Sequence, residues 1–191
     1  MAKLFPTASQ TIGPFFHHGL DRPGWEDLTT EGPLGQTILL EGRIVDGDGQ
    51  PLGDALIEIW QANAAGRYAH PEDKQAKPLD PRFRGFGRVK TAKDGTYRFT
   101  TIKPGAVPGR GNAMQAPHIN MTIFARGLLR HLVTRVYFAD ESANGTDPVL
   151  NSIENAAARR TLVAQANGGT PPSYRFDIVL QGKGETVFFD V

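Results

Sequence analysis

The clearest sign of a β-fold is the segment DGTYRFTTIKPG, residues 94–105, which begins and ends with turn residues. Asp94-Gly95 supplies the positive φ that a tight turn needs, so 96–102 is predicted to be a strand. With a strand over 86–91 and a turn at 93–95, the segment predicts a β-hairpin. The same pattern of short apolar segments between turns predicts further strands at 37–45, 55–61, 118–124, 134–138 and 173–180, with a candidate last strand at 187–191.

The composition agrees with a fold built from short strands. Among the 191 residues, glycine (22) and proline (14) are frequent, which predicts many turns and few long helices. One Ala-rich segment, 152–166, is predicted to be helical, with Asn151 and Glu154 as a capping box. The sequence therefore predicts an all-β fold, an antiparallel β-sandwich with long loops and one or two short helices.

Charge and cysteine content exclude several classes of function. Lys and Arg number 21 and Asp and Glu 20, so the net charge of +1 argues against a basic nucleic-acid-binding protein. The absence of cysteine excludes disulfides, thiolate zinc sites, iron–sulfur clusters and cysteine nucleophiles. Residues 1–10 lack a secretory signal pattern, and no apolar run approaches the roughly 20 residues of a membrane span. We expect a soluble cytoplasmic protein without nucleic-acid or membrane partners.

Several motifs resemble the intradiol ring-cleavage dioxygenases. They occur in the order and spacing of that family: GRIVD at 42–46, ALIEIWQAN at 55–63, GRY at 66–68, PLDP at 78–81, the 94–105 segment and APHIN at 116–120. The resemblance covers the chain from about residue 36 to its C-terminus and implies an antiparallel β-sandwich. It also implies a ferric ion held by two tyrosines and two histidines, since tyrosinate is a hard donor for a hard ion.

The resemblance places the four ligand positions at residues that mostly cannot bind iron. Gln75 and Val107 stand where the family has its two tyrosines. The family's His-x-His pair becomes His118 and Asn120. Both anionic ligands are therefore missing, and we predict no metal site and no catalytic residue on this chain alone. His118 is compatible with a relic ligand, a new catalytic base or a structural histidine, and the absence of a neighbouring acid–base partner in the sequence favours the structural role.

One branch of the family pairs two homologous chains, of which one carries the iron and the other has lost its ligands. The opening SQTIGPF at 9–15 and the ending YRFDI at 174–178 resemble the second kind. The resemblance then implies Fe3+ on a homologous partner chain, a higher hetero-oligomer of such pairs, and a small aromatic acid and O2 as substrates. It also implies that 1–35 form an N-terminal arm and loop contributing to the partner interface, while 36–191 form a single domain.

Four residues are implied to line the partner's substrate pocket: Thr11, Gly13, Pro14 and Arg126. The guanidinium of Arg126 suits the carboxylate of an aromatic acid. Two other readings stay open at this point. One is a stand-alone binding module without catalysis, and the other is an enzyme with a new site around His118.

Overall fold

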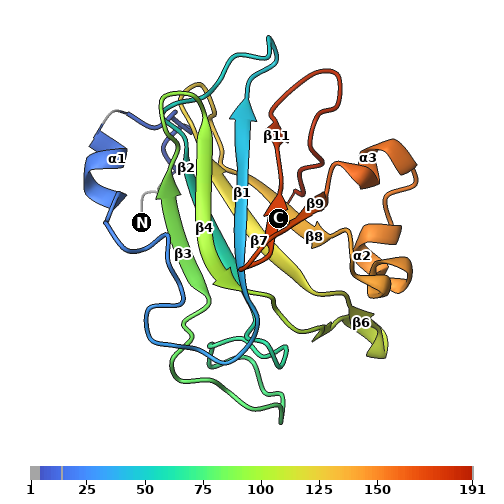
Figure 1. Ribbon diagram of the computed structural model, residues 1–191. Coiled ribbons are helices and arrows are strands. Elements are labelled where there is room, and N and C mark those ends of the chain that lie inside the picture. Colours follow the sequence, from blue (N-terminus) through green and yellow to red (C-terminus); the bar gives the residue numbers. More distant parts are fainter. Residues whose placement is uncertain (1–4, 14, 191) are drawn as a thin grey trace.

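The computed structural model describes residues 5–13 and 15–190, and it is built mostly of strands (Figure 1). The strands are β1 (Thr37–Val45), β2 (Leu56–Gln61), β3 (Phe86–Lys90), β4 (Thr96–Ile102), β5 (Val107–Pro108), β6 (Met114–Gln115), β7 (His118–Phe124), β8 (Leu132–Phe138), β9 (Val163–Gly168), β10 (Ser173–Arg175) and β11 (Ile178–Val179). The helices are α1 (Phe15–Leu20), α2 (Pro148–Asn151) and α3 (Ala156–Arg160). Two 3-10 turns span Arg110–Asn112 and Ser142–Thr146. The predicted all-β class is confirmed.

Nine strands form one curved sheet, and β5 pairs with β6 separately. The order is β11-β1-β10-β9-β8-β7-β2-β3, with β4 on the other side of β1. Most pairs are antiparallel, whereas β1 runs parallel to β10 and β11, and β8 parallel to β9. The sheet curls so far that β3 and β4, at the two ends of the path, come into contact (Figure 1).

The core lies inside this curl because each strand alternates its faces. On β7, Ile119, Met121 and Ile123 are fully buried in the main cluster. His118, Asn120 and the other alternate residues of β7 lie on the opposite face. A smaller apolar cluster beneath α2 contains Tyr137, Leu150 and Leu162. The outer face of β7 is therefore free to carry polar residues.

Four predicted elements differ from the structure. The hairpin around Asp94 is wrong, because β3 pairs with β2 and β4 with β1. The turn at 93–95 does form, but it links the two ends of the curled sheet. The predicted strand over 173–180 is interrupted between β10 and β11, where the chain shifts along β1.

The predicted helix over 152–166 is also wrong. Asn155, rather than Asn151, is the N-cap, and its side chain accepts hydrogen bonds from the amides of Ala157 and Ala158. The helix that follows ends at Arg160, and the remaining residues enter β9 between β8 and β10. The candidate strand over 187–191 is reduced to a single bridge between Phe189 and Val133, and Val191 lies outside the described residues.

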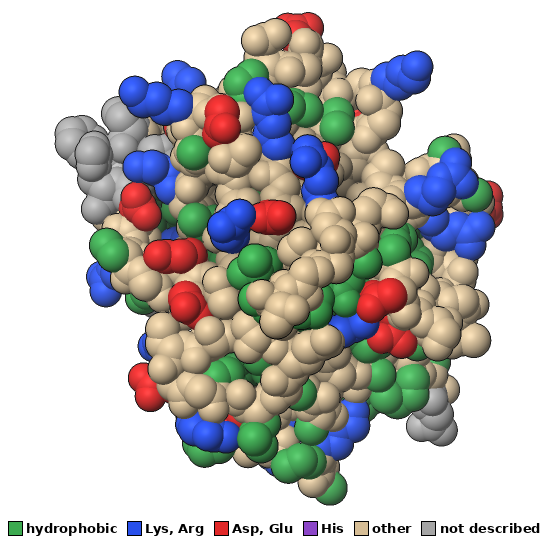
Figure 2. All heavy atoms as spheres, viewed as in Figure 1, with side chains coloured by type: hydrophobic (Ala, Val, Ile, Leu, Met, Phe, Trp, Pro, Cys, Tyr) green, Lys and Arg blue, Asp and Glu red, His purple; other side chains and the backbone are tan. Residues whose placement is uncertain are grey.

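The N-terminal segment is tied to the sheet before β1 begins. The amide of Leu28 donates to the carbonyl of Thr100 at 2.8 Å, and that of Arg88 to the carbonyl of Trp25 at 3.0 Å. Figure 2 shows acidic and basic side chains interspersed over the visible face. Within the described residues, no helix has the length and apolar character that crossing a membrane requires.

Candidate functional site

The structure brings two of the four ligand positions into one cavity. Gln75, in the loop between β2 and β3, and Val107, on β5, both line a hollow of about 620 Å³. We call this hollow the ligand-position pocket. Its other lining residues are Trp60, Tyr68, His70, Glu72, Asp73, Lys74 and Pro108.

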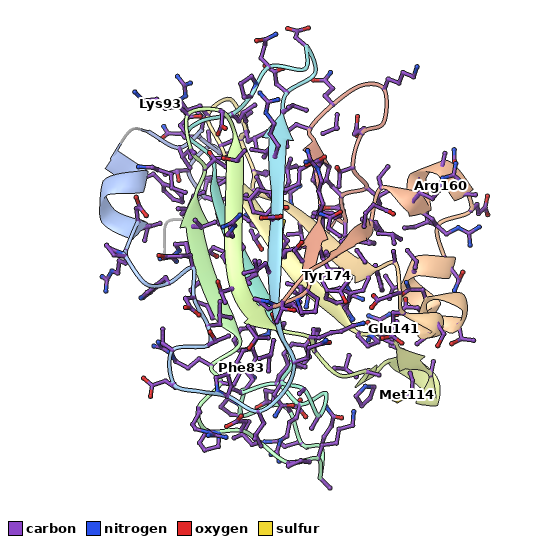
Figure 3. All side chains as sticks on the ribbon, viewed as in Figure 1. Phe83, Lys93, Met114, Glu141, Arg160 and Tyr174 are labelled. Atoms are coloured by element: carbon purple, nitrogen blue, oxygen red, sulfur yellow. The ribbon has the colours of Figure 1, made fainter. Side chains whose placement is uncertain are left out.

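Loops at one end of the sheet hold this pocket open. Asn63 organises them, since its Oδ1 accepts from the amides of Ala65 and Arg67 and its Nδ2 donates to the carbonyl of Pro78. Gly66 has a φ of +80°, and a Cβ there would lie 2.0 Å from the carbonyl oxygen of Ala106. Only glycine allows this approach, which brings the β2–β3 loop against the segment leading to β5. Phe83, labelled in Figure 3, lies at the same end and is buried.

Asn120 occupies its position through hydrogen bonds to the pocket wall. Its Nδ2 donates to the carbonyl of Trp60 and to the hydroxyl of Tyr68, both at 3.3 Å. The rings of Trp60 and Tyr68 stack at 5.8 Å, with planes 19° apart. Burial raises the pKa of Tyr68 above its ordinary value, so this phenol stays protonated at neutral pH. Asn120 is thus held against the wall of the ligand-position pocket by two hydrogen bonds.

His118 is held as a neutral, buried side chain. It is 3% exposed, and its Nδ1 lies 2.7 Å from the carbonyl oxygen of Ala116. A carbonyl only accepts, so Nδ1 carries the proton. Burial, aided by the positive charge of Arg135, lowers the pKa of His118 from 6.5 to about 4. These contacts fit a structural role and not a general base poised near neutral pH.

The residues at the four ligand positions do not fit a ferric ion. Gln75 offers a carboxamide that already donates to the carbonyl of Gly66 and to the carboxylate of Asp73. Val107 offers no donor atom, and Asn120 offers a second carboxamide. One neutral imidazole remains, which is too weak a set for a hard trivalent ion. Across residues 5–13 and 15–190, no three His, Cys, Asp or Glu side chains gather in a way that could hold a metal.

A second cluster forms around Arg126, from three distant segments. The Oγ1 of Thr11 accepts a hydrogen bond from the amide of Gly127 at 2.8 Å. Arg126 and Gly127 are the middle residues of a turn closed by the amide of Leu128 and the carbonyl of Ala125, and Gly127 has a φ of +84°. The side chain of Arg126 is 74% exposed and pairs through Nε with the carboxylate of Asp54. We call Thr11, Asp54 and Arg126 the arginine cluster.

The other two predicted residues of this set are Gly13 and Pro14. Gly13 is exposed, with open space where a Cβ would stand, and its carbonyl accepts from the amide of Phe16. Pro14 lies outside the described residues. After these two residues the chain contacts the end of β7, since the ring of Phe16 lies 5.3 Å from that of Phe124.

The two clusters lie at opposite ends of β7. His118 begins this strand near the ligand-position pocket, and the turn carrying Arg126 follows its end. Seven strand residues span roughly 20 Å. In Figure 1, α1 accordingly lies at the upper left, while the loops of 62–85 lie at the bottom. Thr11 and Arg126 therefore cannot line the pocket of their own chain.

Three site features were not predicted from the sequence. The roles of Asp54 and Tyr68 were not predicted, because their partners, Arg126 and Asn120, are distant in the chain. Arg135 lies on β8, directly opposite Asn120 of β7, and its guanidinium donates to Oε1 of Gln115 at 2.6 Å. Its pairing with β7 becomes visible only once the sheet order is known.

Comparisons with known proteins show the family of the chain. A profile of the family described as "Dioxygenase" matches residues 12–182. The chain is 44% identical to the protocatechuate 3,4-dioxygenase alpha chain of Pseudomonas putida, over 98% of each chain. It is 41% identical to the protocatechuate 3,4-dioxygenase beta chain of Burkholderia cepacia, covering 93% of this chain and 77% of the relative. Among solved structures, the dioxygenase domain of a dioxygenase–carbohydrate-binding fusion from Streptomyces sp. SirexAA-E matches with a TM-score of 0.61 and 25% identity, covering 96% of this chain and 100% of that one.

Proposed function

Because the chain belongs to the intradiol dioxygenase family, we propose that it is the alpha subunit of a protocatechuate 3,4-dioxygenase. In this proposal a homologous beta subunit holds the Fe3+. The complex cleaves protocatechuate between its two hydroxylated carbons with O2 and yields 3-carboxy-cis,cis-muconate. The alpha subunit binds and orients the substrate and contributes no bond chemistry of its own.

One observation carries the proposal: the substrate-binding candidates lie away from the chain's own pocket. The ligand-position pocket has no iron ligand set, and the arginine cluster lies at the other end of β7. A cation and an arm placed so far from their own pocket are explained if they serve a pocket on another chain. A homologous partner supplies such a pocket, because a chain of the same fold has its own metal-site loops at the corresponding end of its strand β7.

The arginine cluster has the chemistry that this role needs. Protocatechuate carries a carboxylate, and an exposed guanidinium recognises carboxylates through paired N–H donors. Thr11 fixes the arm beside Arg126, so Gly13 is carried to the same edge. We assign to Thr11, Gly13 and Pro14 the closing of the partner's pocket. Closure holds the substrate in place and excludes water from the reaction.

Exposed apolar side chains support the proposal that the chain associates with a partner subunit. Leu34, Leu79, Met114 and Leu129 are between 46% and 67% exposed. Met114 lies at the tip of the β5–β6 ribbon, away from the main sheet (Figure 3). Residues 1–35 then serve as the arm and loop at the partner interface, 36–191 as the domain, and pairs assemble into a higher hetero-oligomer.

Activity of the reconstituted pair tests the proposal. The chain is purified alone and together with the beta homologue from the same source, and loss of protocatechuate is followed by ultraviolet absorbance. We expect no turnover from the lone chain, co-elution of the two chains, and turnover by the complex. A chain that stays monomeric beside the beta homologue and leaves its activity unchanged would instead be a stand-alone binding module. Turnover by the lone chain would overturn the assignment of the iron to the partner.

A further inference from the structure

We propose that Asp54 is a positioning residue for Arg126 in substrate recognition. Its carboxylate holds the guanidinium through Nε, which leaves the two Nη groups to bind the carboxylate of the aromatic-acid substrate. This inference rests on the proposed function, since the substrate is bound at the partner's pocket.

The geometry of Arg126 gives the first reason. The guanidinium pairs with Asp54 through Nε, and neither Nη has a hydrogen-bond partner within residues 5–13 and 15–190. Paired N–H donors bind a carboxylate best when the planar fork is held in one orientation. An arginine on an exposed turn otherwise samples many rotamers, and ordering it on binding costs free energy. An acid at Nε removes part of that cost before the substrate arrives.

The rigidity of the Asp54 backbone gives the second reason. The next residue, Ala55, is fully buried, and its amide donates to Oγ1 of Thr91 at 3.0 Å. On the other side, a Cβ on Gly53 would lie 2.8 Å from the backbone of Lys93. The side chain of Asp54 is only 28% exposed, against 74% for Arg126. Asp54 is thus the fixed member of the pair, and Arg126 is the member whose side chain is exposed to a substrate.

The turn of Arg126 is fixed independently. Gly127, with a φ of +84°, allows the turn, and Thr11 accepts from its amide. Two separate contacts therefore hold the backbone and the side chain of one exposed arginine. Because exposed ion pairs add little to folding stability, we expect the effect of Asp54 in substrate affinity and not in melting temperature.

The test compares Asp54→Asn with Asp48→Asn in the complex with the beta subunit. Asp48 lies in the same β1–β2 connection, is exposed and forms no ion pair among the described residues, so it controls for the loss of one charge. We expect Asp54→Asn to raise the KM for protocatechuate about fivefold, with kcat within about twofold. The inhibition constant of catechol, which lacks the carboxylate, should not change. Asp48→Asn should leave both constants unchanged, and Asp54→Glu should restore KM to within about twofold of the wild type.

A double variant separates positioning from a general charge effect. Arg126→Ala should raise KM by itself, and adding Asp54→Asn to it should change nothing further. Asp54→Ser also removes the carboxylate that faces Nε and keeps the Arg126 fork, so it should match Asp54→Asn; this variant decides the question if Asp54→Asn does not assemble. An unchanged KM in Asp54→Asn, or equal effects with and without Arg126, would overturn the role of Asp54. An inactive wild-type complex would overturn the proposed function itself.

Discussion

The hydroxyl of Thr11 and the amide of Gly127 are joined by a 2.8 Å hydrogen bond that spans 116 residues of sequence. This contact places the N-terminal arm at the end of β7 that carries Arg126. The ligand-position pocket lies at the other end. The chain thus separates the predicted ligand positions from Arg126, to which we assign recognition of the substrate carboxylate.

Removing the Thr11 acceptor should release the arm. We predict that Thr11→Val increases amide hydrogen exchange in 7–13, while the melting temperature stays within about 4 °C because one exposed hydrogen bond contributes about 1 kcal/mol at most. Thr7→Val is the matched control, since Thr7 is an exposed arm residue without a hydrogen bond among the described contacts. Equal exchange in the two variants would show that the hydroxyl does not hold the arm.

His118 should make stability depend on pH in mildly acidic solution. Its pKa is about 4 in the folded chain and 6.5 in the unfolded chain, so only the unfolded chain takes up this proton between those values. Above pH 6.5, His118 makes its full contribution to the free energy of unfolding. As the pH falls towards 4 this contribution is lost, and the free energy of unfolding decreases by roughly 3 kcal/mol.

Chemical unfolding at a series of pH values measures this effect. His118→Asn should flatten the decline between pH 6.5 and 4, since asparagine does not titrate. His131→Asn, at an exposed histidine, should keep the slope of the wild type. A His118→Asn variant with the wild-type slope would mean that other groups cause the acid sensitivity.

The hydroxyl of Tyr97 should be important for folding. It is buried and donates to the carbonyl oxygen of Phe176 at 2.5 Å. The same oxygen lies so close to Gly42 that a Cβ there would collide with it. We predict that Tyr97→Phe lowers the free energy of unfolding by about 1–2 kcal/mol, because the carbonyl is left unpaired. Tyr68→Phe, which loses only a 3.3 Å contact with Asn120, is the control and should cost less. Urea titrations of both variants measure the difference; an equal loss would contradict the prediction.

Restoring the missing donors should restore iron binding. The variant Gln75→Tyr, Val107→Tyr, Asn120→His returns two phenols and an imidazole to the positions that the family resemblance assigns, beside a cavity of about 620 Å³. We predict bound ferric iron and a visible tyrosinate-to-iron absorption band. The control carries Phe in place of both tyrosines and should stay colourless. Iron bound equally by both variants would show that Gln75 and Val107 do not mark the ligand positions.

Much of the strand pattern could be predicted from the sequence, because alternation and turn residues are local signals. The ranges of β1, β4 and β7 match the prediction to the residue. The failures arise where partners are not local. Residues 163–168 are Ala-rich and look helical, yet β8 and β10 recruit them into the sheet. The turn at Asp94 looks like a hairpin, but its two strands have other neighbours.

The site was predictable only where a family motif marks it. Gln75, Val107, His118 and Asn120 follow from aligned motifs, and the structure brings Gln75 and Val107 into one cavity. Asp54 has no such motif, and its pairing with Arg126 depends on how the β1–β2 connection folds back on the end of β7. The separation of the two clusters likewise required the strand between them.

The most direct test of the account is the iron content of the lone chain and of the complex. Metal analysis and the visible spectrum are measured on both preparations, each purified from cells supplied with iron. The account predicts a colourless chain with no stoichiometric iron, and a complex with one ferric ion per pair and a tyrosinate-to-iron band. A lone chain that holds one ferric ion and shows that band would contradict the account, because Gln75, Val107 and Asn120 could not then stand at the ligand positions.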